Sequence, residues 1–208
     1  MEVSLTHFLR FTLIVAIAFA ALSRNWSLLF ATSLILILTF LPEFFEKKYK
    51  IMIPDEFELG IILFIYASLF LGEIFDYYAV FPWWDLLLHI GSGVALGFVG
   101  FIMLFTLYYN HKVQSKPIWI SVFAFFFALG IGALWEIFEF TMDQTFGMNM
   151  QRSGLMDTMW DLIVDAAGAL LTSAIGYYYF KRPRIPLFSR IFNKFVEENP
   201  DFFKEKKL

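Results

Sequence analysis

Nine of the 19 acidic residues in this 208-residue chain are expected at the outer ends of its last four hydrophobic segments, together with a single histidine. The acids are Glu73, Asp76, Asp85, Glu136, Glu139, Asp143, Asp157, Asp161 and Asp165, and the histidine is His89. Carboxylate oxygens with one imidazole nitrogen form a suitable ligand set for a hard or borderline divalent cation. The same groups can transfer protons in catalysis. These ten residues are therefore the candidate functional site.

The spacing of these residues places several of them on common helical faces, because residues three or four apart on a helix are neighbours. The pairs with this spacing are Asp85 and His89, Glu136 and Glu139, Asp157 and Asp161, and Asp161 and Asp165. We expect metal-ligand roles for Asp85, His89, Glu136, Glu139, Asp161 and Asp165. Glu136 and Glu139 are also candidates for general acid–base catalysis, with Arg152 as a contact for an anionic headgroup. Glu73, Asp76, Asp143 and Asp157 are expected to be peripheral.

The composition indicates that membrane helices position this site. Hydrophobic residues make up 59% of the chain, Phe alone occupies 28 positions, and only 17% of residues are charged. A soluble domain cannot bury that much apolar surface, so lipid must solvate part of it. The chain has no cysteine, which excludes disulfides, thiolate metal ligands and a cysteine nucleophile. There is no basic face of the kind that binds nucleic acid, nor a Ser-His-Asp order.

Hydrophobic windows of roughly 20 residues are long enough to cross a bilayer as helices. The qualifying windows are residues 6–22, 26–41, 57–76, 85–108, 117–140 and 158–180. Lipid leaves an open chain no other way to satisfy its backbone, so the predicted fold is all-α and polytopic, with six transmembrane helices. Residues 8–22 contain a small-x-small pattern typical of signal-peptidase sites, but only Arg10 is positive before it, and we interpret this segment as a retained helix.

The distribution of basic residues predicts the orientation of the six spans. If both termini share one side, that side holds all of the 16 Lys and Arg residues except Arg24 and Arg152. Basic residues collect in cytoplasmic loops, so both termini are expected to be cytoplasmic and the acidic cluster extracytoplasmic, in the inner membrane. Residues 1–182 form the expected transmembrane domain, with a core bundle over 57–182. Residues 183–208 form a cytoplasmic tail, whose Leu187, Phe188, Ile191, Phe192 and Phe195 share the apolar face of an amphipathic helix.

The predicted depth of the acids makes them difficult to explain as ordinary surface residues. Glu136, His89 and Asp165 are expected a turn or more inside the hydrocarbon edge, where an ionised group costs several kcal/mol unless it is paired or wet. Arg152 is the single basic residue nearby in the sequence. Either several carboxylates are protonated, or cations are bound, or a wet cavity reaches the site.

Structural roles are open for several of these residues. Asp85 could cap the fourth span, and Asp161 could belong to a Thr158-x-x-Asp161 capping box. His89 could be a neutral core histidine that bonds a backbone carbonyl, and Glu73, Asp76 and Asp143 could be solvated at the interface. The segment 144–156 is either a lid over the site or a surface loop. Glu136 is the hardest to assign to structure, because its neighbours Trp135, Ile137 and Phe138 are all apolar.

A weak internal repeat supports a single shared site. Spans three and four carry Glu73-x-x-Asp76 and Asp85-x-x-x-His89, while spans five and six carry Glu136-x-x-Glu139 and Asp161-x-x-x-Asp165. Carboxylates presented by four helices to one centre are also the arrangement of di-metal helical bundles. Small residues allow helices to approach closely enough for short side chains to meet. The glycines with this expected role are Gly93, Gly97, Gly130, Gly132 and Gly168.

Three motifs in this order resemble those of a known family. Asp85-x-x-x-His89, Glu136-x-x-Glu139-Phe140 and Trp160-Asp161-x-x-x-Asp165 resemble the YjdF-type bacterial inner-membrane family and, more distantly, the VanZ-like membrane proteins. The resemblance covers roughly residues 60–180 and implies a shared six-helix fold with its site at these residues. The chain departs from the VanZ-like pattern at Leu86, Glu139 and Asp165, where that pattern has Lys, Gln and Asn. These departures make the site more acidic.

Three functions are compatible with such a site. The first is a membrane enzyme that uses a divalent cation, Mg²⁺, Mn²⁺, Ca²⁺ or Fe²⁺ rather than Zn²⁺, on a lipid-linked or amphipathic envelope substrate. The second is a cation- or proton-coupled transporter, although the inner halves of spans three to six offer only hydroxyls such as those of Ser121, Thr172 and Ser173. The third is a non-catalytic binding or scaffold protein that holds a structural cation. The sequence leaves enzyme activity and oligomeric state open.

Overall fold

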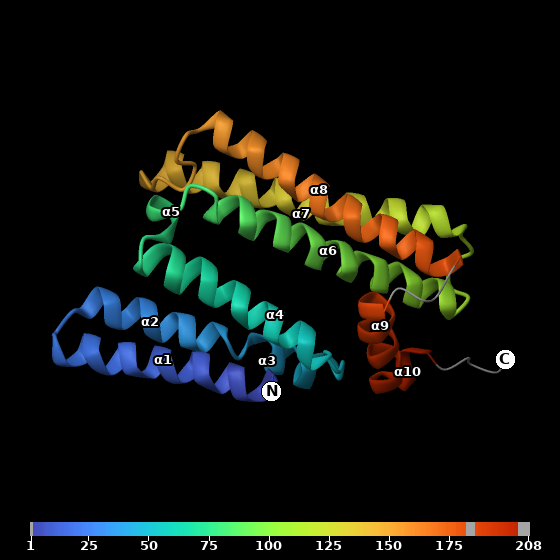
Figure 1. Ribbon diagram of the computed structural model, residues 1–208, viewed down its shortest axis with the longest axis horizontal. Coiled ribbons are helices and arrows are strands. Elements are labelled where there is room, and N and C mark those ends of the chain that lie inside the picture. Colours follow the sequence, from blue (N-terminus) through green and yellow to red (C-terminus); the bar gives the residue numbers. More distant parts are fainter. Residues whose placement is uncertain (1, 182–185, 204–208) are drawn as a thin grey trace. The chain divides into compact units, whose positions relative to one another are not determined.

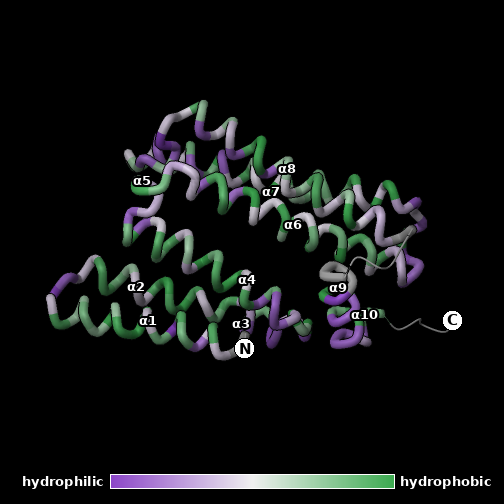
Figure 2. The backbone as a smooth tube through the Cα atoms, in the orientation of Figure 1, coloured by the Kyte–Doolittle hydropathy of each residue, from purple (hydrophilic) through white to green (hydrophobic). Residues whose placement is uncertain are grey.

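The computed structural model describes residues 2–181 and 186–203, and within these ranges the chain is helical, without strands (Figure 1). The order is α1 (Glu2–Leu22), α2 (Trp26–Leu38), α3 (Leu41–Tyr49), α4 (Asp55–Ile65), η1 (Tyr66–Ile74), α5 (Tyr77–Val80), α6 (Trp84–Tyr109), α7 (Pro117–Phe146), α8 (Leu155–Lys181), α9 (Pro186–Glu198) and α10 (Pro200–Phe203). Among the described residues, six stretches are long and apolar enough to span a membrane, which confirms the predicted fold class. Figure 2 shows hydrophobic residues along the long helices and hydrophilic residues at many of their ends.

The chain divides into two compact units. The first contains Met1–Trp84 with Asn193–Asn199, and the second contains Asp85–Phe192 with Pro200–Leu208. In the first unit, Leu13 of α1, Ile35 of α2 and Phe70 of η1 are buried against one another. A hydrogen bond of 2.9 Å between the hydroxyls of Thr12 and Tyr66 adds a polar contact at this packing.

The second span consists of two helices, α2 and α3, rather than the single short helix that the sequence predicts. Pro42 directly follows the predicted window 26–41, but it lies in the first turn of α3, where a missing N–H costs nothing. Trp26–Tyr49 together form one candidate span. The position of Pro42 therefore divides the span without ending it.

Arg10 of α1 stabilises the break between α2 and α3. Its guanidinium donates to the carbonyl of Thr39 at 2.7 Å and to the Thr39 hydroxyl at 3.2 Å, and it forms an ion pair with Glu43 at 2.8 Å. The guanidinium carbon also lies 4.0 Å from the centre of the Phe40 ring. Carbonyls at a helix end need partners from outside the helix, and a charged donor suits this place. Arg10 is consequently buried with its charge paired to Glu43 and with Nε and Nη2 hydrogen-bonded to Thr39.

The third span changes from α-helix to π-helix at Tyr66, a change that the sequence did not indicate. Such wide turns are rare and usually short, so a segment of nine residues needs support from its surroundings. The indole N–H of Trp84 donates to the carbonyl of Ala67 at 3.2 Å, and the ring of Phe70 packs against Tyr66 and Phe75. Glu73 lies in this π-helix, and Asp76 follows it with a left-handed φ of 57°.

In the second unit, α6, α7 and α8 run alongside one another (Figure 1). Glycines permit the close approach of α6 and α8. A Cβ atom on Gly168 would lie 2.5 Å from the carbonyl oxygen of Ile90, and one on Gly97 would lie 3.1 Å from Cβ of Thr172. The Thr172 hydroxyl also donates to the carbonyl of Val94 at 3.0 Å. The expected role of these glycines is confirmed, whereas Gly130 has nothing within 4 Å of its Cβ position.

The predicted amphipathic tail forms the helix α9, and residues 183–185 and 204–208 of that tail lie outside the described residues. In the second unit, Phe192 is buried and its ring packs against those of Phe105 and Tyr179. In the first unit, the Asn199 side-chain amide forms a pair of 2.7 Å hydrogen bonds, one to the N–H and one to the carbonyl of Met52. Phe192 of α9 is thus packed within the second unit, and Asn199, which follows α9, is bonded within the first unit.

We expect the change Arg10→Met to destabilise the first unit by about 2 kcal/mol, because it leaves the Thr39 carbonyl and the Glu43 carboxylate without their donor. The measurement is the midpoint of unfolding in a denaturing detergent. Arg24→Met is the control, because it replaces an exposed arginine in the same unit. Equal stability of the two variants would contradict this role of Arg10.

Candidate functional site

The site is built where the N-terminal turns of α6 and α8 meet the C-terminal half of α7. His89 lies in the second turn of α6, Glu136 and Glu139 lie about two turns before the end of α7, and Asp161 and Asp165 follow the first turn of α8. All five side chains are buried, with exposed fractions between 1% and 7%. Three helices therefore enclose a group of five acids and bases in a largely apolar bundle.

The two nitrogens of the His89 ring have different partners. Nδ1 lies 3.3 Å from Oδ2 of Asp165, and Nε2 lies 3.8 Å from an oxygen of Asp85 and 3.8 Å from an oxygen of Glu136. The ring nitrogens of His89 therefore face carboxylates, and the hydrogen bond to a backbone carbonyl that the sequence left open is not present among the described residues. The ring stands at the centre of the site, with acids on both sides.

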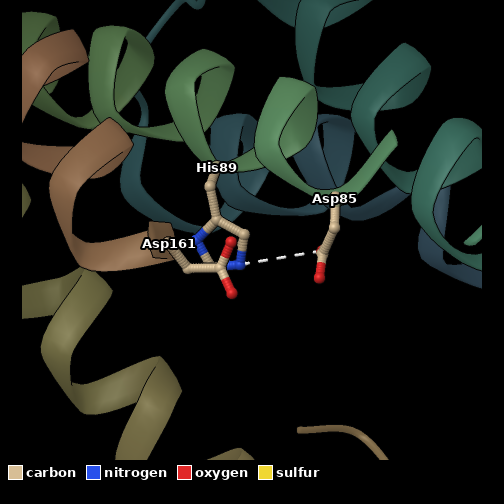
Figure 3. A group of neighbouring side chains, drawn as sticks. All are labelled: Asp85, His89 and Asp161. Atoms are coloured by element: carbon tan, nitrogen blue, oxygen red, sulfur yellow. Dashed lines mark ion pairs between the residues drawn. The ribbon is translucent and has the colours of Figure 1, made fainter. Parts of the chain in front are cut away.

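Asp85, His89 and Asp161 each place one ligand atom within 4.8 Å of the other two (Figure 3). Asp85 and His89 project from α6, and Asp161 reaches them from α8. One nitrogen and two carboxylate oxygens at this separation can surround a single divalent cation. Asp85 is the most accessible of the three, with 26% of its side chain exposed.

Glu136 and Asp161 contribute buried oxygens that accept no hydrogen bond. Among the described residues, no donor meets hydrogen-bond geometry at either oxygen of Glu136 or at Oδ2 of Asp161, although the Thr158 hydroxyl lies near the Glu136 carboxylate. A buried carboxylate oxygen without a donor is strongly unfavourable, because its hydration is lost without replacement. These oxygens face a site that includes His89, so a bound species that supplies positive charge would satisfy them.

Glu139 occupies a separate position beside this group. Its Oε1 accepts a 2.9 Å hydrogen bond from the indole N–H of Trp135, one turn earlier on α7. Glu139 is buried, and it is subject to the charges of Glu136 and Asp85. It is thus a carboxylate held by one neutral donor close to the candidate cation ligands.

Asp165 lies on the side of His89 away from Asp85 and is enclosed on all sides. The hydroxyl of Ser92 donates to the backbone carbonyl of His89 at 2.8 Å and lies 3.3 Å from Oδ1 of Asp165, while Oδ2 faces the His89 ring. A Cβ on Gly132 would overlap its carboxylate, and one on Gly93 would lie 2.6 Å from its backbone oxygen. The absence of side chains at these two glycines is what makes room for Asp165.

Two of the predicted peripheral acids anchor the connection between α7 and α8. The carboxylate of Asp143 accepts the N–H groups of Met150 at 2.7 Å and Gln151 at 2.9 Å, and Asp157 accepts the N–H of Arg152 at 3.1 Å. The side-chain amide of Gln151 donates to the Thr158 hydroxyl at 2.6 Å. Residues 147–154 therefore form a loop that is hydrogen-bonded to both flanking helices, and its function as a lid stays a prediction.

The expected helix-cap roles of Asp85 and Asp161 do not explain their positions. Helix α8 begins at Leu155, so Thr158 lies inside the helix and the alternative of a Thr158–Asp161 capping box is excluded. Helix α6 begins at Trp84, which places Asp85 in its first turn and near His89. Both acids are oriented toward the site.

Glu73 and Asp76 belong to the first unit, whereas the other candidate acids belong to the second. Their predicted peripheral role stays a prediction. Sequence reasoning missed two polar partners in the second unit, Ser92 and Trp135. Ser92 lies three residues after His89 and Trp135 lies four residues before Glu139, so helical spacing from the known candidates would have indicated both.

Comparison with known proteins places the chain in a family. Residues 5–182 match the model of a family described as "Predicted membrane protein (DUF2238)". The chain belongs to this family. An uncharacterized protein of Thermotoga maritima, similar to this chain, is 29% identical over 155 residues, which cover 70% of this chain and 77% of that protein. No solved structure matches the chain.

Membership in this family confirms that the protein is a membrane protein, and it agrees with the YjdF-type resemblance. The more distant VanZ-like resemblance has no support from these comparisons. The multi-pass arrangement follows from the six candidate spans, while the inner-membrane location and the cytoplasmic termini stay predictions. The matched segment includes all the candidate site residues.

We expect Asp143→Ala to release the loop at residues 147–154, because two backbone N–H groups lose their acceptor. Loss of these hydrogen bonds should speed the hydrogen exchange of the Met150 and Gln151 amides roughly tenfold. Hydrogen–deuterium exchange with mass spectrometry measures this change. Thr141→Ala removes an exposed polar side chain near the same end of α7 and should leave the exchange unchanged.

Proposed function

We propose that this protein binds one divalent cation between α6, α7 and α8, with ligands from Asp85, His89, Asp161 and Glu136. The observation that carries the proposal is the set of buried carboxylate oxygens beside His89 that lack hydrogen-bond donors. The cation supplies the positive charge that these oxygens need, and the imidazole nitrogen supplies a neutral ligand. The positive-inside pattern assigns this site to the extracytoplasmic side.

Charge balance favours a cation over water as the occupant. Asp85, Glu136 and Asp161 carry three negative charges when ionised, and burial in a low-dielectric bundle makes their mutual repulsion large. Water can donate hydrogen bonds but carries no net charge. Protonation of the acids is the competing explanation, and a metal measurement distinguishes the two.

The ligand chemistry limits the identity of the cation. The chain has no cysteine, and the second unit contributes a single buried histidine among carboxylates. Oxygen-rich sites with one imidazole suit Mg²⁺, Mn²⁺, Ca²⁺ or Fe²⁺ better than the sulfur- and histidine-rich sites of structural zinc.

We further propose that the bound cation serves catalysis on an amphipathic envelope or lipid-type substrate. Asp85 is partly exposed, so a substrate oxygen has a route to the cation past its side chain. A divalent cation polarises such an oxygen or activates a water molecule. Glu139, held by Trp135 beside the ligands, is placed to transfer a proton, and Arg152 in the tied loop provides positive charge for an anionic headgroup.

Cation or proton transport is the second candidate, supported by polar groups farther along the same helices. The hydroxyls of Ser121 on α7 and Ser173 on α8 are buried without a hydrogen-bond partner among the described residues. Water beside such hydroxyls would extend a polar path from the site along the bundle. Flux in proteoliposomes that is abolished by Glu136→Gln would favour transport over catalysis.

The test of cation binding is elemental analysis of purified protein, followed by titration of metal-depleted protein with Mn²⁺. We expect close to one equivalent of cation per chain in the wild type and a loss of most of it in Glu136→Gln. Glu197→Gln makes the same chemical change at an exposed position outside the spans and should retain the cation. A wild-type protein that folds without bound metal and takes up no Mn²⁺ would refute the proposal.

A further inference from the structure

We infer that Asp165 is a positioning residue that fixes the ring of His89, so that Nε2 presents its lone pair to the cation. This inference rests on the proposed cation site, although its central claim concerns the ring alone. Sequence reasoning gave Asp165 the role of a cation ligand. The geometry instead points to a role through His89, because Asp165 lies on the Nδ1 side of the ring while Asp85 and Glu136 lie on the Nε2 side.

The protonation of the ring follows from the partner of each nitrogen. An ionised carboxylate only accepts hydrogen bonds, so the contact of 3.3 Å between Nδ1 and Asp165 requires a proton on Nδ1. A neutral imidazole with its proton on Nδ1 has its lone pair on Nε2. That lone pair is then directed to the side where the oxygens of Asp85 and Glu136 lie, each 3.8 Å from Nε2. The distance leaves space for an ion between nitrogen and oxygens.

The surroundings of Asp165 support a fixed orientation. Its side chain is 2% exposed, and the oxygen that does not face His89 lies 3.3 Å from the Ser92 hydroxyl. The close approach of Gly132 on α7 leaves the carboxylate no space to turn in that direction. Ser92 lies one turn after His89 on α6 and its hydroxyl bonds the His89 carbonyl, so the hydroxyl beside Asp165 is attached to the same turn of helix as the ring.

A fixed ring strengthens the site in a way that an additional acidic ligand would not. Groups that hold a ligating histidine in one tautomer and raise its basicity typically contribute about 10- to 100-fold to metal affinity. Imidazole nitrogen suits first-row transition ions better than Ca²⁺ or Mg²⁺. Orientation by Asp165 therefore favours Mn²⁺ and Fe²⁺ within the group of cations proposed above.

The first test is nitrogen NMR of metal-depleted protein labelled at histidine, taken at a pH where the ring of His89 is neutral. The chain has three histidines, so removal of His7 and His111 isolates the His89 signal. We expect the proton on Nδ1 in the wild type and a shift toward Nε2 in Asp165→Ala. A wild-type ring with its proton on Nε2 overturns the inference, and this result does not depend on the folding of any variant at position 165.

The second test keeps every proposed ligand and displaces only the carboxylate of Asp165. Gly132→Ala places a methyl group where that carboxylate lies, whereas Gly130→Ala adds a methyl group to the same helix in open space. We expect Mn²⁺ to bind about 10- to 100-fold more weakly to Gly132→Ala, and Gly130→Ala to bind as the wild type does. Gly130→Ala thereby controls for the effect of a methyl group on α7.

The outcomes separate this inference from the proposed function. Wild-type affinity for Mn²⁺ in folded Gly132→Ala protein would overturn the positioning role and leave the cation site intact. A wild-type protein without Mn²⁺ binding, but with the His89 proton on Nδ1, would remove the cation site and retain the orientation by Asp165.

Discussion

The structure of the second unit depends on the negative charge that three apolar helices enclose. Glu136, Asp161 and Asp165 are almost inaccessible, and His89 is the buried base among them. Lipid and apolar side chains cannot replace the hydration that these carboxylates lose. The unit must therefore combine close helix packing with compensation of charge at one end of the bundle. His89, with acids on both sides of its ring, contributes to that compensation.

The two units treat buried charge in opposite ways. In the first unit, Arg10 is buried but has partners, because Glu43 balances its charge and Thr39 accepts its hydrogen bonds. In the second unit, both oxygens of Glu136 and one of Asp161 lack a donor within the described residues. A buried ion with all its partners is explained by structure alone. A buried carboxylate without them is better explained by an occupant, and this contrast supports the choice of the second unit as the functional one.

Close packing and chemistry in this unit come from the same glycines. Gly93 and Gly168 allow α6 and α8 to approach, and Gly132 on α7 leaves room for the carboxylate of Asp165. A larger side chain at any of these positions would separate the helices or displace the acid. The acids Asp143 and Asp157 have a different task, since their carboxylates hold the loop that joins α7 and α8. The hydrogen-bond donors around each acid thus distinguish the acids of the candidate site from those that hold the loop.

The sequence by itself determined the membrane class and the six spans, and it selected the candidate site residues, because hydrophobic length and helical spacing are local properties. Asp85 with His89 and Glu136 with Glu139 are placed on common faces by spacing alone. Only the tertiary structure decided that Asp165 faces Nδ1 of His89 while Asp85 and Glu136 face Nε2, since these contacts join different helices. The helix that contains Pro42 gives a second example. The Thr39 carbonyl at the break before this helix accepts a hydrogen bond from Arg10, which is distant in sequence. Contacts between helices depend on the rotation and the distance of one helix relative to another. The periodicity of residues within one helix does not specify either.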